Sequence, residues 1–319
     1  MNLKIAGLGR GIPKRSVTND ELAEFLDTSD EWIVPRTGIK SRFICTDESL
    51  TDLCETAANQ ALRNAGVTAG ELDLIIATTI GGDYSTPSLA FVLAESIHAN
   101  CPAFDINAAC AGFIYALDAA AAYLETNRAK KILIVSAEKM SRHINWSDRS
   151  TCILFGDGAG AAVVTPGDSL KYCGISAENN TRVLNLPTST GTSPFATVKA
   201  GVSYLHMDGG EVFKFAVSSV ARETAKALEA CGLSPDDIDF YVLHQANKRI
   251  INSIRTRMKL PEEKFPVNID RYGNMSSASV PVLLSEMSDD GRLKRGDKLL
   301  LCAFGAGLTT ATSVLIWDN

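Results

Sequence analysis

Cys110 is the residue of this chain with the clearest potential for chemistry. The segment from Pro102 to Leu124 predicts a short strand that turns directly into a long, Ala-rich helix, with Cys110 in the first helical turn. A helix N-terminus carries about half a positive charge and free N–H groups, which favour a thiolate. A buried cysteine that only fills space is the alternative. The rest of the chain favours a nucleophile, because a histidine and an asparagine occupy similar positions at strand ends.

His244 ends a predicted strand over Phe240–Leu243 and stands just before a predicted helix. The other three histidines, at positions 98, 143 and 206, have no comparable setting. A helix N-terminus disfavours the imidazolium form, so the pattern predicts a neutral histidine that donates a hydrogen bond. A histidine that satisfies a local backbone group is the alternative interpretation.

Two further turns could contribute to a site. Asn274 follows a strand-like stretch and Gly273, and small residues and a predicted helix come after it. Phe304-Gly-Ala-Gly307 follows a predicted strand over Leu299–Ala303. Glycines let backbone N–H groups approach a reacting carbonyl, as an oxyanion hole requires. Both segments are also consistent with ordinary tight turns.

One glycine-rich segment does not indicate a nucleotide site. Residues 155–164 formally match a dinucleotide-binding fingerprint. A strand-like Ala-Val-Val-Thr and Pro166 follow, where that motif requires a helix.

A basic cluster begins directly after His244, in an otherwise acidic protein. It lacks acidic residues and consists of Lys248, Arg249, Arg255, Arg257 and Lys259. A solvated helix face explains many such runs. The alternative is a docking surface for an acidic partner, because complementary charge steers encounter.

The composition limits the function classes. The chain has 319 residues, is 45% hydrophobic and 21% charged, and carries a net charge of −6, which argues against a general nucleic-acid binder. The sequence shows no secretory signal, and no apolar stretch reaches the roughly 18 residues needed to span a membrane. We therefore expect a cytoplasmic protein. Its eight cysteines form no CxxC pair, so we expect mostly structural free thiols and no disulfide or metal site.

The chain contains an internal duplication. Residues 61–76 align without a gap to residues 227–242, and residues 131–136 align to residues 298–303, with offsets of 166 and 167. Helices alternate with apolar strands in both halves, which predicts an α/β fold with buried sheets between helix layers. We expect an N-terminal half over 1–168 that carries the cysteine, and a C-terminal half over 169–319 that carries the histidine and asparagine. Ligands bind at the carboxyl ends of strands in such folds, so both halves could face one cleft.

These motifs together resemble the β-ketoacyl-acyl carrier protein synthase III family of the thiolase superfamily. The resemblance rests on Ala-Ala-Cys110-Ala-Gly-Phe, on His244-Gln-Ala-Asn, on Gly-Asn274-Met-Ser-Ser-Ala-Ser-Val-Pro and on residues 27–39, 155–161 and 304–307. It covers essentially the whole chain. It implies a five-layer αβαβα fold, a homodimer, and decarboxylative Claisen condensation of an acyl-CoA primer with malonyl-acyl carrier protein, the first condensation of fatty acid biosynthesis. Acyl-CoA would be a substrate, and no metal or redox cofactor would be needed.

The resemblance also implies roles for residues. Cys110 would be acylated, and His244 with Asn274 would promote decarboxylation. The backbone N–H groups of Cys110 and Ala306 would form the oxyanion hole. Coenzyme A would contact Trp32, Arg36, Arg149, Phe213, Asn247 and Arg249. The basic cluster would dock the carrier protein.

This chain departs from some members of the family at two places. Thr86 stands where some members carry a bulky Phe that closes the acyl pocket across the dimer. The smaller side chain of Thr86 predicts space for primers that are longer than acetyl or branched. The other expected pocket residues are Phe155 and Phe304. The turn 304–310 lacks the Gly-Gly-Gly and the following Trp of some members. Ala306 should preserve the backbone N–H if its conformation accommodates a Cβ atom.

Three other interpretations stay open at this stage. A related condensing enzyme of secondary metabolism would use the same three side chains with a different primer or acceptor. Papain-like proteases also use Cys, His and Asn, but their Cys-Gly-Ser/Ala-Cys-Trp type signature is missing. An inactive scaffold that only binds acyl carriers would not need an intact Cys, His and Asn set.

Overall fold

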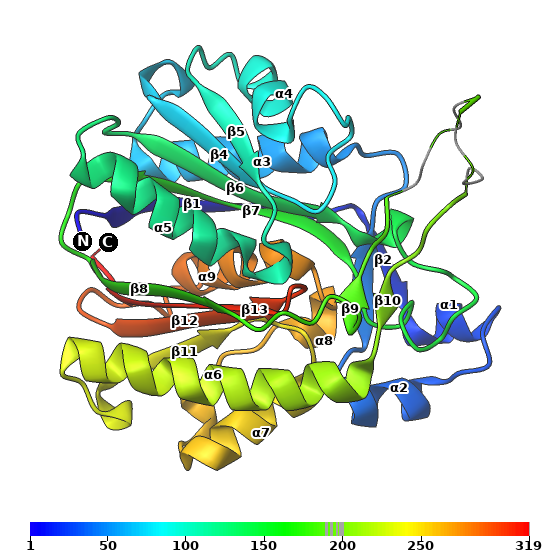
Figure 1. Cartoon of the computed structure of the whole chain (residues 1–319). Helices are drawn as coiled ribbons and strands as arrows, with labels where there is room; N and C mark the ends of the chain where they lie inside the picture. The colour runs from blue at the N-terminus through cyan, green and yellow to red at the C-terminus, as the bar shows by residue number, and fades with distance from the viewer. Residues whose placement is uncertain (189–190, 192–193, 196, 198–200, 319) are drawn as a thin grey trace.

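Two stacked β-sheets, with helices between and outside them, form the fold (Figure 1). The computed structural model describes residues 1–188, 191, 194–195, 197 and 201–318. The first sheet has the strand order β1-β7-β6-β4-β5, and the second has β11-β12-β13-β8. The strands of the first sheet come from residues 4–165 and those of the second from residues 170–316.

The two sheets share one pairing pattern. In the first, β4 is parallel to β5 and β6, and β7 lies antiparallel between β6 and β1. In the second, β11 is parallel to β12, and β13 lies antiparallel between β12 and β8. The strands are β1 (Lys4–Gly11), β4 (Leu74–Thr78), β5 (Ala103–Ile106), β6 (Ile132–Lys139), β7 (Asp157–Thr165), β8 (Leu170–Ala177), β11 (Phe240–Leu243), β12 (Lys298–Gly305) and β13 (Thr309–Ile316). The duplication inferred from the sequence is thus visible in the pairing.

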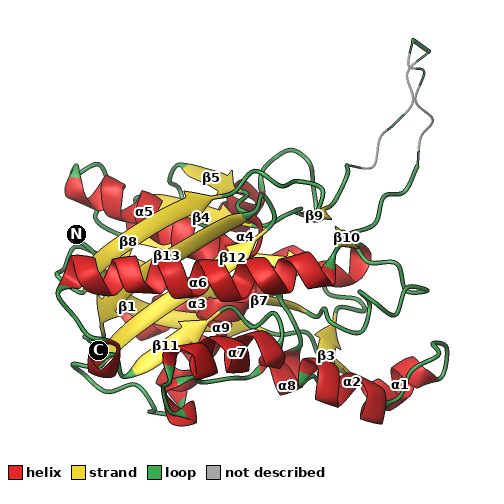
Figure 2. Cartoon of the chain, turned by 60° about the horizontal axis from the view of Figure 1, so that its bottom comes forward, coloured by secondary structure: helices red, strands yellow, loops and turns green. Residues whose placement is uncertain are grey.

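Helices complete a five-layer arrangement, as expected from the sequence (Figure 1). Outside the first sheet lie α3 (Leu50–Ala65) and α4 (Leu89–Ser96). Between the sheets lie α5 (Gly112–Glu125) and α9 (Ser279–Asp289), whose apolar side chains form one core with both sheets. Outside the second sheet lie α6 (Gly209–Cys231) and α7 (Lys248–Met258). Figure 2 shows α6 running along the second sheet, with α7, α8, α2 and α1 along one side of the molecule.

Shorter elements surround the strand ends. They are the strand pairs β2 (Arg15–Thr18) with β3 (Ser41–Ile44) and β9 (Leu184–Asn185) with β10 (His206–Met207), and the helices α1 (Asn19–Ala23), α2 (Asp30–Thr37) and α8 (Ile269–Tyr272). Six 3-10 turns are described: η1 (Ala69–Glu71), η2 (Ala109–Ala111), η3 (Met140–Arg142), η4 (Pro235–Asp237), η5 (Glu262–Lys264) and η6 (Ser276–Ala278). None of the helices described is both long and apolar enough to cross a bilayer.

The predicted strands are confirmed, with one exception. Strand β4 is buried at all five positions, as its continuous apolar run indicates, and β7 confirms that no helix follows the glycine-rich segment. The strand-like interpretation of the stretch before Asn274 is wrong, because residues 269–272 form the short helix α8. The side chain of Asn268 donates to Glu286 at 3.0 Å, and its backbone N–H donates to Gln245 at 3.2 Å. These contacts between distant segments fix the start of α8, and no local pattern reports them.

Candidate active site

Cys110 lies in the turn between β5 and α5. The turn is η2, and α5 begins at Gly112, two residues after the thiol. Ala109 adopts a left-handed conformation with φ of 46°, which turns the chain sharply before the cysteine. A Cβ atom on Gly305 would lie 2.8 Å from the Cys110 nitrogen, so only glycine permits β12 to approach this closely.

The expectation that the helix N-terminus stabilises a thiolate at rest is wrong. Burial raises the pKa of the Cys110 thiol to about 12, so the thiol is protonated at neutral pH. Position distinguishes Cys110 from the other cysteines as the candidate nucleophile. Of the eight, Cys110 is the one that lines the cavity described below, within the part of the chain that the structure describes.

His244 lies at the carboxyl end of β11, next to the parallel strand β12. It follows β11 directly, and its backbone N–H donates to the carbonyl of Cys302 in β12 at 2.8 Å. The ring packs edge-on against Phe304, with 5.3 Å between the ring centroids. Burial lowers the pKa of His244 to about 3, so the imidazole is neutral, as the sequence predicted. The described residues offer no hydrogen-bond partner to its Nδ1 atom.

Asn274 is fixed by its backbone and by one end of its side chain. Its N–H donates to Leu154 at 2.8 Å, and its carbonyl accepts from Gly156 at 3.0 Å. Its Oδ1 atom accepts from the Ser276 N–H at 2.8 Å. The amide orientation is thereby set, with Nδ2 as the end that can donate to a ligand.

A cavity of about 510 Å³ brings these groups together. All three side chains line it, although Cys110 and His244 each follow a strand and Asn274 lies in the connection between α8 and α9. Its walls are mostly apolar, and they include the predicted pocket residues Phe155 and Phe304. Ala306 also lines the cavity, and it is not among the described non-glycine residues with positive φ, so its Cβ atom is accommodated. The strand ends of both sheets therefore face one cleft.

Most of the predicted coenzyme A contacts lie on this cavity. Trp32, Arg36, Phe213 and Asn247 line it. Arg149 does not, but its guanidinium lies over one Trp32 ring at 4.9 Å, and that of Arg36 lies over the same ring at 4.5 Å.

Arg249 and the rest of the basic cluster lie on α7 or at its end, outside the cavity lining. Asn247 begins this helix by accepting from the Arg249 N–H at 2.8 Å. Among the described residues, none of the five cations of the cluster forms an ion pair.

Thr86 lies on the surface of its own chain. It is exposed in the loop between β4 and α4, and it does not line the cavity of that chain. The sequence analysis places its role across a dimer, which one chain does not test, so that role stays a prediction.

The sequence analysis missed two residues near the site. Ser276 lines the cavity, and the buried Glu138 accepts a hydrogen bond from its hydroxyl at 3.0 Å. Ser276 lay within the Asn274 motif, and Glu138 follows the apolar run 132–136 by two residues, where an acid at a strand end was a usable signal. No group of three or more His, Cys, Asp or Glu that could hold a metal ion occurs in the described ranges.

Comparisons with known proteins agree with this geometry. Residues 104–189 match the family model described as 3-oxoacyl-[acyl-carrier-protein] synthase III, and residues 228–317 match the model of its C-terminal part. The β-ketoacyl-[acyl-carrier-protein] synthase III of Caldanaerobacter subterraneus subsp. tengcongensis is 44% identical over 99% of this chain and 98% of its own.

Solved structures agree as well. The 3-oxoacyl-[acyl-carrier-protein] synthase III of Aquifex aeolicus has a TM-score of 0.92 at 42% identity, over 99% of this chain and 100% of its own. The priming β-ketosynthase from the R1128 polyketide biosynthetic pathway has a TM-score of 0.93 at 36% identity, over 100% of this chain and 97% of its own. With its thiolase-like fold and its matches along the whole length, the chain belongs to the β-ketoacyl-[acyl-carrier-protein] synthase III family of condensing enzymes.

Proposed function

We propose that this protein condenses an acyl-CoA primer with malonyl-acyl carrier protein to give 3-oxoacyl-acyl carrier protein, the step that initiates fatty acid biosynthesis. The observation that carries the proposal is the convergence of a thiol, a neutral imidazole and an oriented amide on one mostly apolar cavity. A nucleophile and two neutral donors are the groups that a decarboxylative condensation needs.

The first half-reaction acylates Cys110. Its sulfur attacks the acyl-CoA carbonyl, the C–S bond to coenzyme A breaks, and the thiol proton leaves with coenzyme A as its free thiol. Since burial keeps the resting thiol protonated, proton loss must accompany attack. The backbone N–H groups of Cys110 and Ala306 stabilise the oxyanion of the tetrahedral intermediate.

The second half-reaction uses His244 and Asn274. The malonyl thioester loses carbon dioxide, and negative charge builds on its thioester oxygen. Hydrogen bonds from the imidazole and from the Asn274 amide stabilise this enolate. A histidine whose pKa is near 3 remains neutral, so it does not protonate the carbanion. The carbanion then attacks the acyl carbonyl on Cys110, the bond to sulfur breaks, and the Cys110 thiolate takes up a proton from solvent.

Substrate binding follows from the surroundings of the cavity. Trp32 would stack on the adenine of coenzyme A, and Arg36, Arg149 and Arg249 would meet its phosphates. The electron pair for carbon–carbon bond formation is that of the bond broken when the malonyl carboxylate leaves as carbon dioxide. We therefore expect acyl-CoA as a substrate and no resident cofactor. The unpaired cations of the basic cluster would dock the acidic carrier protein.

A homodimer is part of the proposal. Strand β5 stands at the edge of the first sheet, and an edge strand leaves N–H and C=O groups unpaired. Phe91 of α4, the helix that packs on β5, is 52% exposed. A second copy on this edge would bury both features. The exposed Thr86 would then be free to contribute to the partner's acyl pocket. A cytoplasmic location stays a prediction.

A condensing enzyme of secondary metabolism is the second candidate, and the similarity to the R1128 priming ketosynthase favours keeping it. Turnover with a panel of acyl-CoA primers and with either malonyl-carrier protein or malonyl-CoA separates the two. Release of carbon dioxide and formation of a 3-oxoacyl carrier product would support the primary proposal. Condensation onto a coenzyme A acceptor alone would favour the second candidate, and absence of any Cys110 acylation would overturn both.

A further inference from the structure

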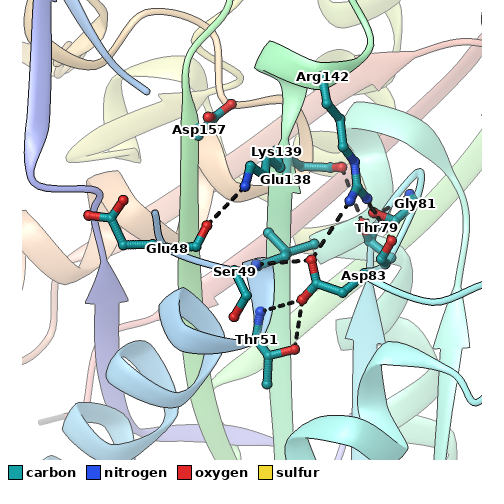
Figure 3. A network of polar contacts seen from close by, with 12 residues as sticks. Glu48, Ser49, Thr51, Thr79, Gly81, Asp83, Glu138, Lys139, Arg142 and Asp157 are labelled. Carbon is teal, nitrogen blue, oxygen red and sulfur yellow. Dashed lines mark hydrogen bonds and ion pairs between the residues drawn. The ribbon is translucent and has the colours of Figure 1, made fainter. Parts of the chain in front are cut away.

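A buried carboxylate, that of Glu138, lies beside the site, and the mechanism above gives it no role. Glu138 stands one residue before the end of β6 and is 1% exposed. Its Oε2 atom accepts hydrogen bonds from the Ile80 N–H at 3.1 Å and from the Thr79 hydroxyl at 3.4 Å. Figure 3 shows Glu138 next to Thr79 at this strand end. One oxygen is thus fully engaged by residues that follow β4.

The other oxygen binds the turn after Asn274. Oε1 accepts from the hydroxyl of Ser276 at 3.0 Å, from the hydroxyl of Ser277 at 2.7 Å and from the Ser277 N–H at 3.4 Å. A single carboxylate therefore ties η6, from the C-terminal part of the chain, to the ends of β4 and β6.

Ser276 connects this carboxylate to the reacting groups. Its N–H donates to Asn274 Oδ1 at 2.8 Å, and its backbone is left-handed with φ of 47°. That conformation is unfavourable for a non-glycine residue, so contacts such as the one with Glu138 must hold it. Ser276 lines the same cavity as Cys110. Burial raises the pKa of the Cys110 thiol, and the charge of Glu138 raises it further.

The hydrogen bonds match an ionised carboxylate. Each oxygen faces one backbone N–H, that of Ile80 or that of Ser277, and a backbone N–H cannot turn to accept. Burial raises the pKa of Glu138, while the hydrogen bonds from Ser277, Ile80 and Ser276 act in the opposite direction. A glutamine at this position would place its NH₂ group against one of these N–H groups in either orientation. The site is therefore built for Glu and not for its neutral isostere.

We propose that Glu138 is a positioning residue for the condensation: its carboxylate holds Ser276, and through Ser276 it orients the Asn274 amide and the hydroxyl beside Cys110. A hydroxyl has one proton, so donation to Glu138 leaves only lone pairs to face the thiol. The role toward Asn274 rests on the proposed function. The coupling of Glu138 to Cys110 does not, and it can be measured without substrate.

The first test measures the rate at which iodoacetamide alkylates Cys110 as a function of pH, with peptide mapping. Glu138 is the charge that acts on this thiol, and His244 in the same cavity is neutral. In Glu138→Gln the charge is gone and the Ser276 proton is released toward the sulfur. The midpoint pH of the alkylation profile should fall by about one unit, the scale on which one neighbouring charge shifts a pKa.

Asp157→Asn is the matched control. Asp157 is also a buried carboxylate, and it accepts from the backbone N–H groups of Cys45 and Ser141, each at 2.8 Å. Among the described residues it shares no hydrogen-bond partner with Glu138, so the alkylation profile of this variant should stay that of the wild type. An unshifted Glu138→Gln profile, or an equal shift in both variants, would overturn the coupling.

The second test uses substrates. Glu138→Gln should lower the kcat of condensation roughly 10- to 100-fold, because misplacing a reacting group by about 1 Å has that cost, while self-acylation of Cys110 falls less. Glu138→Asp keeps the charge and should recover part of kcat. A kcat within twofold of wild type in Glu138→Gln overturns the proposal. If that variant does not fold, Ser276→Ala, which removes only the hydroxyl, must show the kcat loss. A wild type without any condensation contradicts the proposed function, whereas the alkylation test remains decisive for Glu138.

Discussion

Residues 61–76 and 227–242 lie in different sheets and build the same local structure. The helices α3 and α6 both end at a left-handed glycine, Gly66 and Gly232, each with φ of 64°. In both copies a 3-10 turn follows, and a hydroxyl residue, Thr68 or Ser234, forms a capping box with an acid three residues on. The buried strands β4 and β11 come next.

The same likeness extends to the neighbouring strands. Asp73 accepts from the N–H of Lys131, directly before β6, at 2.9 Å, and Asp239 accepts from the N–H of Lys298, the first residue of β12, at 2.8 Å. Each aspartate thereby fastens the amino end of one parallel strand to the next. The duplicated scaffold is closely matched where the strands begin.

The carboxyl ends of the same strands differ. Strand β4 leads to Thr79 and Ile80, which bind the Glu138 carboxylate, whereas β11 leads to the buried His244. Cys110, the proposed nucleophile, follows β5, which has no counterpart among the described strands of the second sheet. Condensation needs unlike groups, a nucleophile on one side and neutral donors on the other, and two identical halves would not supply them. The two halves therefore diverge mainly at the carboxyl ends of their strands, where the proposed catalytic groups lie.

The largest loss of activity is expected when the proposed nucleophile of the first half is removed. Cys110→Ala should lower condensation by at least about 10³-fold, because no acyl-enzyme can form. Mass spectrometry after incubation with an acyl-CoA should find the acyl group on the Cys110 peptide alone. Cys231→Ala, which changes a cysteine at the end of α6, should keep this labelling. Loss of labelling in Cys231→Ala with retention in Cys110→Ala would reverse the assignment.

Removing the donors of the second half should separate the two half-reactions. His244→Ala and Asn274→Ala should each reduce carbon dioxide release from malonyl-carrier protein about 10²- to 10³-fold, the usual cost of one oxyanion donor. Self-acylation of Cys110 should remain substantial, and a mass shift measures it in the same samples. Unchanged carbon dioxide release in both variants would refute the division of labour between the halves.

Substitutions in the basic cluster test whether the outer face of the second half docks the carrier protein. Arg249→Ala with Lys259→Ala should raise the KM for malonyl-carrier protein roughly 5- to 10-fold and weaken its salt dependence, since exposed charges contribute about 0.5–1 kcal/mol each. Lys259→Ala alone separates carrier docking from the coenzyme A contact proposed for Arg249. Lys130→Ala with Lys294→Ala changes two exposed cations before β6 and β12 and should leave the KM unchanged. Equal KM values in both double variants would make the cluster a solvated face.

Substitution of Thr86 tests whether the loop that follows β4 in the first half limits the length of the acyl primer. Wild-type protein should accept primers longer than acetyl, because each buried methylene contributes about 0.8 kcal/mol. Thr86→Phe should shift preference toward acetyl-CoA by a few fold per methylene, measured as the ratio of kcat/KM values. Since Thr86 is exposed in one chain, the shift should occur only in a dimer, which size-exclusion chromatography with light scattering would monitor. A wild type that turns over acetyl-CoA far faster than C4–C12 primers would contradict the prediction.

The smallest effect on activity is expected where the halves agree. Gly66→Ala and Gly232→Ala should each lower the free energy of unfolding by about 1 kcal/mol, because alanine is strained in the left-handed region. A Cβ atom would meet no atom within 4 Å at either position, so the backbone alone sets the cost. Thermal unfolding should show similar shifts for the two variants, with kcat unchanged. Clearly unequal shifts would show that the two caps are not equivalent.

Much of the fold is encoded locally and could be predicted from the sequence. Continuous apolar runs predicted β4, β6, β11 and β12, and the glycine stops predicted the ends of α3 and α6. These signals depend on neighbours within a few residues, through hydrogen bonds of the backbone and burial on both strand faces. Cys110, His244 and Asn274 were candidates for the same reason, since each stands in a recognisable connection before a helix.

Other properties arise only when distant segments pack together. The short helix α8 is fixed by contacts of Asn268 with Gln245 and Glu286, and the role of Glu138 requires Ser276, 138 residues away. Burial raises the pKa of the Cys110 thiol to about 12, although the thiol lies directly before a helix, a position that the sequence reveals. Sequence pattern determined which residues could react, and tertiary burial decided their protonation states and the geometry in which they meet.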